Sequence, residues 1–256
     1  MRTIQFVRDI ASGKVFKVED VIASQKEGFK IRNEYNEDPD RFECPECGQN
    51  LVVSGSAKNN IYFRHRPHLG YCMLKDEMLN EDLIGEQYKF LYARESDRHK
   101  ELKNRIGSAL FSVDGVDVKS VRVDSSFIIK GDDRRKPDVY CRYKNRELVF
   151  EIQLSPLSLR FIKWRLRFYQ ENGIFLIWVL DINGNSGLLS NMQRDIKHLF
   201  PMQNLFSLNE ESLDLKLICN YKIPFLHENR EVWEKWHTKN IGLSDIKFNI
   251  DTVEAF

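Results

Sequence analysis

The stretch Lys136–Gln153, KPDVYCRYKNRELVFEIQ, decides how the larger part of this chain folds. It contains two apolar runs, Pro137–Tyr143 and Leu148–Leu154, and a Lys-Asn-Arg turn signal separates them, so we predict two neighbouring strands. Residues two apart on a strand share a face, so Glu151 and Gln153 point together while the apolar residues between them pack into the opposite layer. This pattern predicts an apolar sheet that carries polar residues at one place.

The segments around this stretch complete an α/β pattern. We predict a helix that begins near Glu95, a strand over Val118–Ile129, a helix from Ser155 as N-cap to Gly173, and a buried strand over Ile174–Leu180. With the two strands above, the order is αβββαβ. That order is expected for a restriction-endonuclease-like, PD-(D/E)xK core, although other folds share it.

A group of metal-binding residue types precedes this core. Cys44 and Cys47 lie three positions apart on a turn that ends in glycine, and His65 and Cys72 follow after gaps of 17 and 6 residues. A structural zinc ion takes four nitrogen or sulfur ligands in tetrahedral geometry. We therefore predict one structural zinc ion bound by these four residues, with His68 as the alternative fourth ligand.

We predict three parts in the chain. Residues 1–77 form a small β-rich zinc-binding domain, residues 78–185 form the PD-(D/E)xK core, and residues 186–256 form a helical extension that packs on the core. Within the first part, the apolar runs on either side of Ser12-Gly13 predict two paired strands, and residues 51–63 predict a hairpin.

Two acids are predicted to meet in the sheet, because Asp138 precedes Glu151 by 13 positions across a turn. A carboxylate on a strand with both faces covered needs a cation or a partner. Two carboxylates favour Mg²⁺ or Mn²⁺, whose shell is completed by waters and a phosphate oxygen. Such an ion activates a bound water for in-line attack, and Gln153 would position that water. A chance acidic strand is the alternative.

The helix at Glu95 brings more polar groups to the same place. At about 100° per residue, Glu95, His99 and Lys103 share a side with Leu102 and Ile106. We predict Glu95 beside the metal, as a ligand or through water, with His99 and Lys103 facing the scissile phosphate. An exposed Glu95–His99 pair is the alternative.

Basic residues gather in the same region, although the net charge of the chain is only +1. Residues 130–169 include eleven Lys or Arg and five Asp or Glu. Arg160, Lys163 and Arg167 form one stripe of the helix that follows Glu151. Such a stripe neutralises phosphates without reading sequence, so we predict DNA as the partner, selected by its structure or strandedness.

Other features of the sequence indicate where in the cell the protein is located. The longest apolar runs, such as Ile174–Leu180, are far shorter than the roughly 18 residues of a membrane span. The N-terminus lacks the pattern of a signal peptide, and the odd number of cysteines, five, fits a reducing compartment. We therefore expect a cytoplasmic protein without a membrane span.

In order and spacing, five segments resemble the CoiA-like competence-protein nucleases. They are CPEC…FRH…C (44–72), ESDRHKELK (95–103), KPDV (136–139), FEIQLSPLS (150–158) and RLRFYQENGIFLIWVL (165–180). The resemblance implies a zinc-finger-like N-terminal part and a PD-(D/E)xK nuclease core. It also implies Asp138, Glu151 and Gln153 as site residues, with Glu95 from the helix. Arg165 and Tyr169 match a recurring Arg and Tyr of that family, and we place both with the DNA-binding residues.

Gln153 departs from the general pattern, which has Lys at this position. A neutral Gln can only position water by hydrogen bonding, and Lys103 or His99 would supply the missing positive charge. We predict a divalent-metal-dependent deoxyribonuclease that acts in DNA uptake, recombination or defence, with other DNA-processing proteins as partners. The alternatives are a DNA-binding module with a degenerate site and a zinc-ribbon adaptor.

Overall fold

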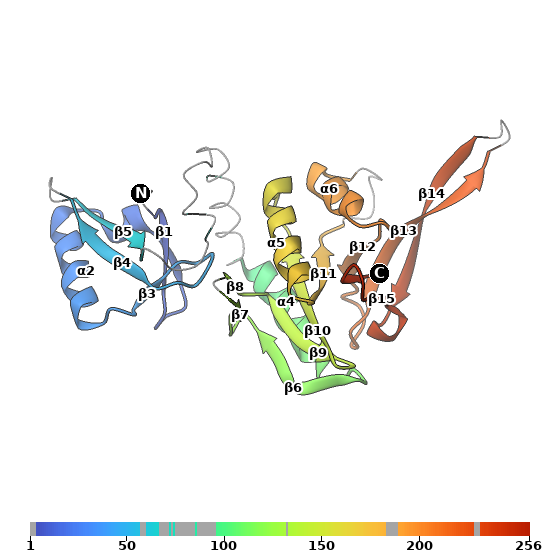
Figure 1. Ribbon diagram of the computed structural model, residues 1–256, viewed down its shortest axis with the longest axis horizontal. Helices are drawn as coiled ribbons and strands as arrows, with labels where there is room; N and C mark the ends of the chain where they lie inside the picture. The colour runs from blue at the N-terminus through green and yellow to red at the C-terminus, as the bar shows by residue number, and fades with distance from the viewer. Residues whose placement is uncertain are drawn as a thin grey trace. The chain divides into compact units, whose positions relative to one another are not determined.

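The computed structural model describes residues 4–56, 60–66, 72, 74, 85, 96–131, 133–182, 189–227 and 231–256. Its elements are labelled in Figure 1. The chain divides into two compact units, the first comprising Met1–Glu95 with Phe127–Lys136 and the second Ser96–Ser126 with Pro137–Phe256. Among the described helices, none is long and apolar enough to cross a membrane.

The N-terminal segment of the first unit forms two small antiparallel sheets in its described residues. Strand β1 (Phe6–Asp9) pairs with β2 (Val15–Lys17) and with β3 (Phe42–Glu43). A separate hairpin joins β4 (Leu51–Gly55) and β5 (Ile61–His65). Both strand pairs predicted from the sequence are therefore confirmed.

Two helices in this unit were not predicted from the sequence. Helix α1 (Val18–Val21) takes residues expected in the second strand, and α2 (Gln25–Glu37) fills the segment before the first cysteine. The Ser24 hydroxyl accepts the Glu27 N–H at 3.2 Å, and the two side chains are also hydrogen bonded. Ser-x-x-Glu is a helix-start signal that was present in the sequence.

The second unit is built on one seven-stranded sheet with the order β14-β13-β12-β11-β10-β9-β6. Its strands are β6 (Val116–Val123), β9 (Val139–Tyr143), β10 (Arg146–Gln153), β11 (Phe175–Leu180), β12 (Leu205–Leu208), β13 (Leu217–Leu226) and β14 (Val232–Ile241). Strand β11 is parallel to both β10 and β12, and the other neighbours are antiparallel. The unit is thus mixed α/β with a mostly β core.

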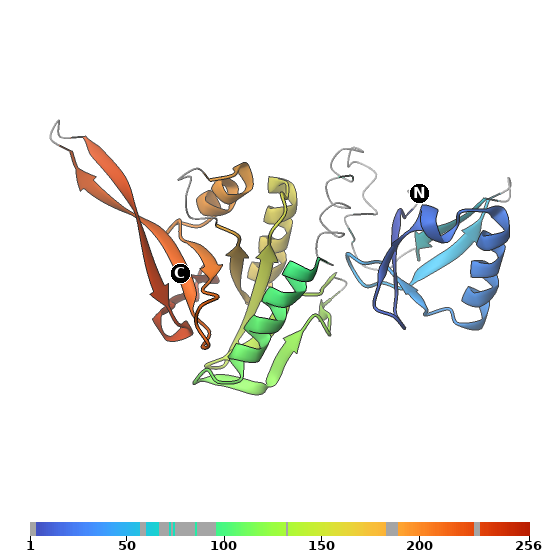
Figure 2. The same cartoon turned by 180° about the vertical axis from the view of Figure 1, so that it is seen from behind.

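Three helices accompany this sheet: α4 (Asp97–Leu110), α5 (Leu159–Glu171) and α6 (Asn191–Leu199). Helix α5 lies in front of the sheet in Figure 1 and α4 lies in front of it in Figure 2, so these two helices cover opposite faces. The chain order α4-β6-β9-β10-α5-β11 follows the predicted αβββαβ order, with one hairpin inserted after β6.

That hairpin corrects the predicted strand over Val118–Ile129. Strand β6 ends before Asp124, which has a positive φ of 43°. Strands β7 (Ile128–Lys130) and β8 (Asp133–Arg135) then pair with each other and belong to the first unit. The first unit therefore contains residues that the sequence places inside the core.

The C-terminal part corrects the predicted helical extension over 186–256. In its described residues, α6 is the one α-helix, while β12, β13 and β14 continue the sheet. A short 3-10 helix, η2 (Leu243–Asp245), and the pair β15 (Phe248–Asn249) and β16 (Glu254–Ala255) follow. Residues Leu217–Asn220 alternate between buried and half-buried, which is the period-two pattern of a strand. The core therefore does not end at residue 185.

Candidate metal centre and buried acidic site

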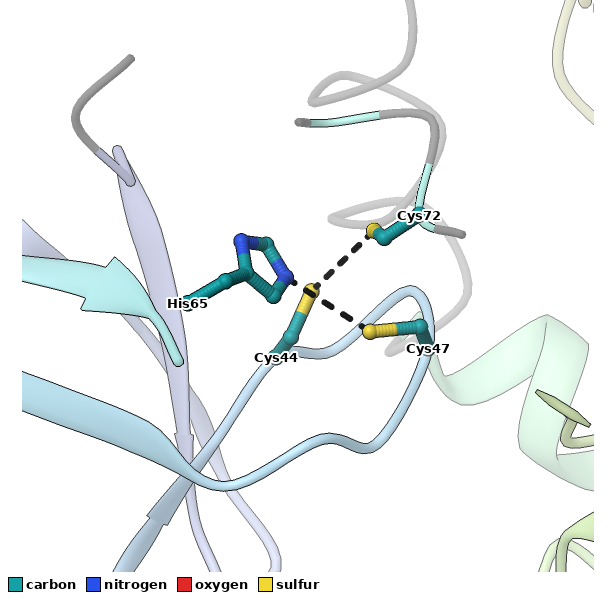
Figure 3. A group of neighbouring side chains, drawn as sticks. All are labelled: Cys44, Cys47, His65 and Cys72. Atoms are coloured by element: carbon teal, nitrogen blue, oxygen red, sulfur yellow. Dashed lines mark hydrogen bonds between the residues drawn. The ribbon is translucent and has the colours of Figure 1, made fainter. Parts of the chain in front are cut away.

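Four side chains of the first unit converge as predicted (Figure 3). The ligand atoms of Cys44, Cys47, His65 and Cys72 all lie within 4.8 Å of one another, and all four residues are buried. The Sγ atoms of Cys44 and Cys72 are 3.9 Å apart, and Cys47 Sγ is 3.5 Å from His65 Nε2. With metal bonds of about 2.3 Å to sulfur and 2.0 Å to nitrogen, tetrahedral ligands would be separated by about 3.8 Å and 3.5 Å.

The spacing therefore fits a closed tetrahedral site, and this buried Cys₃His cluster could hold a metal such as zinc. It is the one group of three or more His, Cys, Asp or Glu residues with metal-binding geometry in the described ranges. The alternative ligand, His68, lies outside those ranges.

The thiols of the cluster differ in their ionisation. Burial raises the pKa of the Cys44 and Cys72 thiols. Burial acts in the same direction on Cys47, but hydrogen bonds with Cys44, Cys72 and the Gln49 backbone together hold the Cys47 pKa well below its usual range. Metal binding requires thiolates. Burial disfavours their negative charge, and a bound cation would compensate for it.

The inserted hairpin segment supports the turn that carries the first two cysteines. Arg135 Nη1 donates to Glu46 Oε1 at 2.7 Å, and both side chains are buried. Gly48 has a φ of 64°, and a Cβ there would lie 1.9 Å from the ring of Phe127. The turn therefore requires glycine for its backbone and for its packing. Sequence reasoning found the glycine but not its neighbour.

The second site begins with Asp138, just before β9. Its carboxylate is fully buried, and Oδ2 accepts the Ile152 N–H at 2.8 Å. His99 Nε2 lies 3.2 Å from the same Oδ2 and 3.2 Å from the Ile152 carbonyl oxygen. Val139 pairs with Phe150 in the β9–β10 ladder, so one further step along the ladder sets Asp138 opposite the residue after Phe150.

That residue is Glu151, which is also buried. Tyr169 Oη donates to Glu151 Oε1 at 2.5 Å, and Arg165 Nη1 lies 3.7 Å from Oε2. Arg165 and Tyr169 are themselves buried on α5. The prediction that places them at the DNA surface is therefore wrong: both side chains hold the acid in place.

Gln153 stands at the end of β10 with its side chain buried. Its Nε2 donates to the Ser155 carbonyl oxygen at 2.5 Å, while its Oε1 has no hydrogen-bond partner among the described residues. The N-cap of α5 is Ser158, which corrects the predicted helix start at Ser155.

The polar residues of α4 lie on its buried side, as predicted. His99, Leu102, Lys103 and Ile106 are all buried. Lys103 Nζ donates to Asp124 Oδ2 at 2.5 Å, and sequence reasoning did not identify this partner. Glu95 lies outside the described residues.

The basic stripe is on the opposite side of α5 from the acids. Arg160, Lys163 and Arg167 are exposed, whereas Phe161 and Phe168 are buried. The stripe is therefore accessible, and its contact with phosphates stays a prediction.

A family model described as Domain of unknown function (DUF6035) matches residues 83–256, which is more than half of the chain. The chain belongs to this family. A second model, Domain of unknown function (DUF7830), matches residues 13–79. No curated protein and no solved structure shows a significant match. In this DUF6035 member, the acids Asp138 and Glu151 lie in the first match, and the Cys₃His cluster lies in the second.

Proposed function

We propose that this DUF6035 protein is a CoiA-like, divalent-metal-dependent deoxyribonuclease with a restriction-endonuclease-like core and a structural zinc ion at the Cys₃His cluster. One observation carries the proposal. Two buried carboxylates, Asp138 and Glu151, stand at the end of one strand ladder, beside the amide of Gln153, whose buried oxygen has no partner among the described residues.

The donor types, two carboxylates and an amide oxygen, are those that Mg²⁺ or Mn²⁺ takes. Both ions prefer oxygen ligands and usually combine one or two carboxylates with waters and substrate oxygens. Asp138 and Glu151 would hold the ion, and Gln153 Oε1, which has no hydrogen-bond partner among the described residues, would accept a hydrogen bond from a bound water. When bound, such an ion lowers the pKa of a water and stabilises negative charge at phosphorus. Glu95, which lies outside the described residues, is proposed as a further ligand.

Other residues of the site would position these groups. His99 lies against Asp138, and Tyr169 fixes one oxygen of Glu151. Lys103 is paired with Asp124, so we assign the fixed positive charge of the site to Arg165, 3.7 Å from Glu151. Exposed Arg160, Lys163 and Arg167 on α5 would bind the phosphates of the substrate.

A second candidate function also has support from the same geometry. Asp138 and Glu151 already contact His99, Tyr169 and Arg165, and buried carboxylates with such partners can be purely structural. In that case the protein is a DNA-binding module with a degenerate site.

Cleavage of labelled single-stranded, duplex and nicked DNA, and of RNA, separates the two candidates. The nuclease should shorten or nick DNA with Mg²⁺ or Mn²⁺ and do so neither in Ca²⁺ nor without divalent ions. Binding of DNA without cleavage of any form under all metals would favour the degenerate module. Omitting divalent ions is preferable to a chelator, which would also remove metal from the cysteine cluster.

A further inference from the structure

The last two strands of the sheet form a ribbon that extends beyond it. Strands β13 and β14 are paired along ten positions, from Leu217–Ile241 to Leu226–Val232. Strand β12 pairs with β13 only between Leu217 and Asn220. Past Asn220, β13 and β14 therefore continue as a two-stranded ribbon, and both views show it projecting from the sheet (Figures 1 and 2).

The two faces of this ribbon differ in chemistry, because cross-strand partners in a register share a face. The face that we call the aromatic face carries Tyr221, Ile223, Phe225, Trp233, Lys235 and His237, and it continues to Lys239 beside the part of β13 that also pairs with β12. The opposite face carries Lys222, Pro224, Leu226, Val232, Glu234 and Trp236.

Rings on the aromatic face stack in pairs, and two of them are exposed. Tyr221 and His237 stack with centroids 5.8 Å apart, and His227 stacks on Trp233 at 4.4 Å. Phe225 and Trp233 are a cross-strand pair that remains 43% and 49% exposed. The ribbon therefore presents flat ring surfaces to solvent.

The lysines of the aromatic face are open to a partner, and an acid, Glu231, follows at its outer end. Lys235 and Lys239 are exposed, and no described carboxylate forms an ion pair with either. Glu231, at the outer end, accepts the indole N–H of Trp233 at 3.3 Å.

The opposite face, by contrast, is satisfied within the molecule. Lys222 pairs with Glu234 at 2.5 Å, and Lys222 and Lys197 each lie 5.5 Å from the ring of Trp236. The opposite face already pairs its lysine with an acid. The aromatic face is therefore the one whose lysines can bind an external partner.

A two-stranded ribbon is marginally stable in water, and exposed apolar groups on it indicate an interaction surface. Aromatic rings alternating with lysines are the elements of a single-strand binding platform, where unpaired bases stack on rings and cations follow the phosphates. Paired bases in a duplex do not offer their ring faces in this way. A second copy of the chain fits poorly, since two such faces would bring four lysines together.

We propose that the aromatic face binds single-stranded nucleic acid, with bases stacked on Phe225 and Trp233 and phosphates bound by Lys235 and Lys239. This inference rests on the proposed function, and it names the substrate form that the acidic site would receive.

The test compares two double variants of adjacent cross-strand pairs. Phe225→Ser with Trp233→Ser removes the rings, and Leu226→Ser with Val232→Ser removes equally apolar groups from the opposite face, where they are 68% and 70% exposed. Anisotropy of a labelled oligothymidylate, without divalent ions, gives the affinity. We expect the first variant to bind at least about tenfold more weakly, because it loses the rings on which bases stack, and the control to bind within about twofold of wild type.

Circular dichroism should show that both variants retain the fold, and Phe225→Tyr with Trp233→Phe, which keeps the rings, should restore most of the affinity if the serine variant loses structure. Equal losses in the two serine variants, equal wild-type affinity for the matched duplex, or full competition by a base-free polyphosphate would each overturn the inference.

The outcomes also separate this inference from the proposed nuclease activity. Wild-type protein that binds the single strand through the rings but cleaves nothing would leave the binding face in place and remove the nuclease. Protein that cleaves with an unchanged KM in the Phe225→Ser, Trp233→Ser variant would remove the binding face and leave the nuclease.

Discussion

Glu46→Ala should strongly destabilise the first unit. The Glu46 carboxylate accepts from Arg135 Nη1 at 2.7 Å, and the side chains of Glu46 and Arg135 are only 1% and 3% exposed. Glu46→Ala removes the carboxylate to which this buried guanidinium donates. Breaking a buried ion pair in this way costs about 3–5 kcal/mol.

A surface pair of the same unit provides the matched control. Lys17 and Glu19 are 3.4 Å apart with both side chains exposed, and exposed pairs contribute about 0–1 kcal/mol. Glu19→Ala should therefore change the free energy of unfolding by less than about 1 kcal/mol. Replacing both buried partners, as Glu46→Met with Arg135→Met, should recover most of the loss, because apolar residues of similar volume often substitute well for a buried pair.

The assay is urea unfolding of the full chain, followed by circular dichroism, with metal content determined for each variant. Metal content matters because Glu46 lies between Cys44 and Cys47. The reasoning from burial of the pair is refuted if Glu46→Ala retains its metal and its free energy of unfolding equals that of Glu19→Ala.

Three further predictions concern the two sites. Cys47→Ser should lower both the zinc content and the unfolding midpoint, whereas Cys219→Ser should retain one zinc per chain, as elemental analysis and thermal unfolding would show; equal zinc content in both would contradict the assignment. Gly48→Ala should cost at least about 1 kcal/mol, from the positive φ and from the clash with Phe127, and an unchanged melting temperature would count against it. Gln153→Lys should preserve or raise the initial cleavage rate in Mn²⁺, and Gln153→Ala should lower it. The reverse order of these rates would contradict the role of Gln153.

The metal cluster could be predicted because its signal is local and chemical. Cys44 and Cys47 share one turn. Residue types and spacing were sufficient to predict that they bind one ion together with His65 and Cys72. The end of β10 was predictable for a similar reason: the period-two pattern fixes which residues flank Glu151, and the turn before it fixes the neighbouring strand that sets Asp138 close by.

The environment of Glu151 depends on contacts that no single segment reveals. A hint was present, because Arg165 and Tyr169 lie four and eight positions after Phe161 and so share its buried side of α5. Periodicity alone indicates that side, but it does not show that a buried carboxylate lies next to the guanidinium there.

The inserted hairpin and the C-terminal strands were missed for different reasons. No Gly or Pro separates β6 from β7, so the sequence does not show that the chain leaves the sheet at Asp124. Strands β13 and β14 do alternate, but their free ends expose both faces, which weakens the contrast between apolar and polar positions that a strand prediction uses.

The most direct test of the proposed nuclease is the initial rate of Mn²⁺-dependent DNA cleavage by wild type, Asp138→Asn and Glu151→Gln. These replacements keep the side-chain shapes beside Ile152 N–H and Tyr169, whereas alanine would also remove structural hydrogen bonds. Exposed Glu171→Gln is the matched control. We expect each site variant to lose at least about a hundredfold in rate, because the metal contributes several kcal/mol, with DNA affinity in Ca²⁺ retained. Cleavage by Asp138→Asn and Glu151→Gln at the wild-type rate would contradict the proposal.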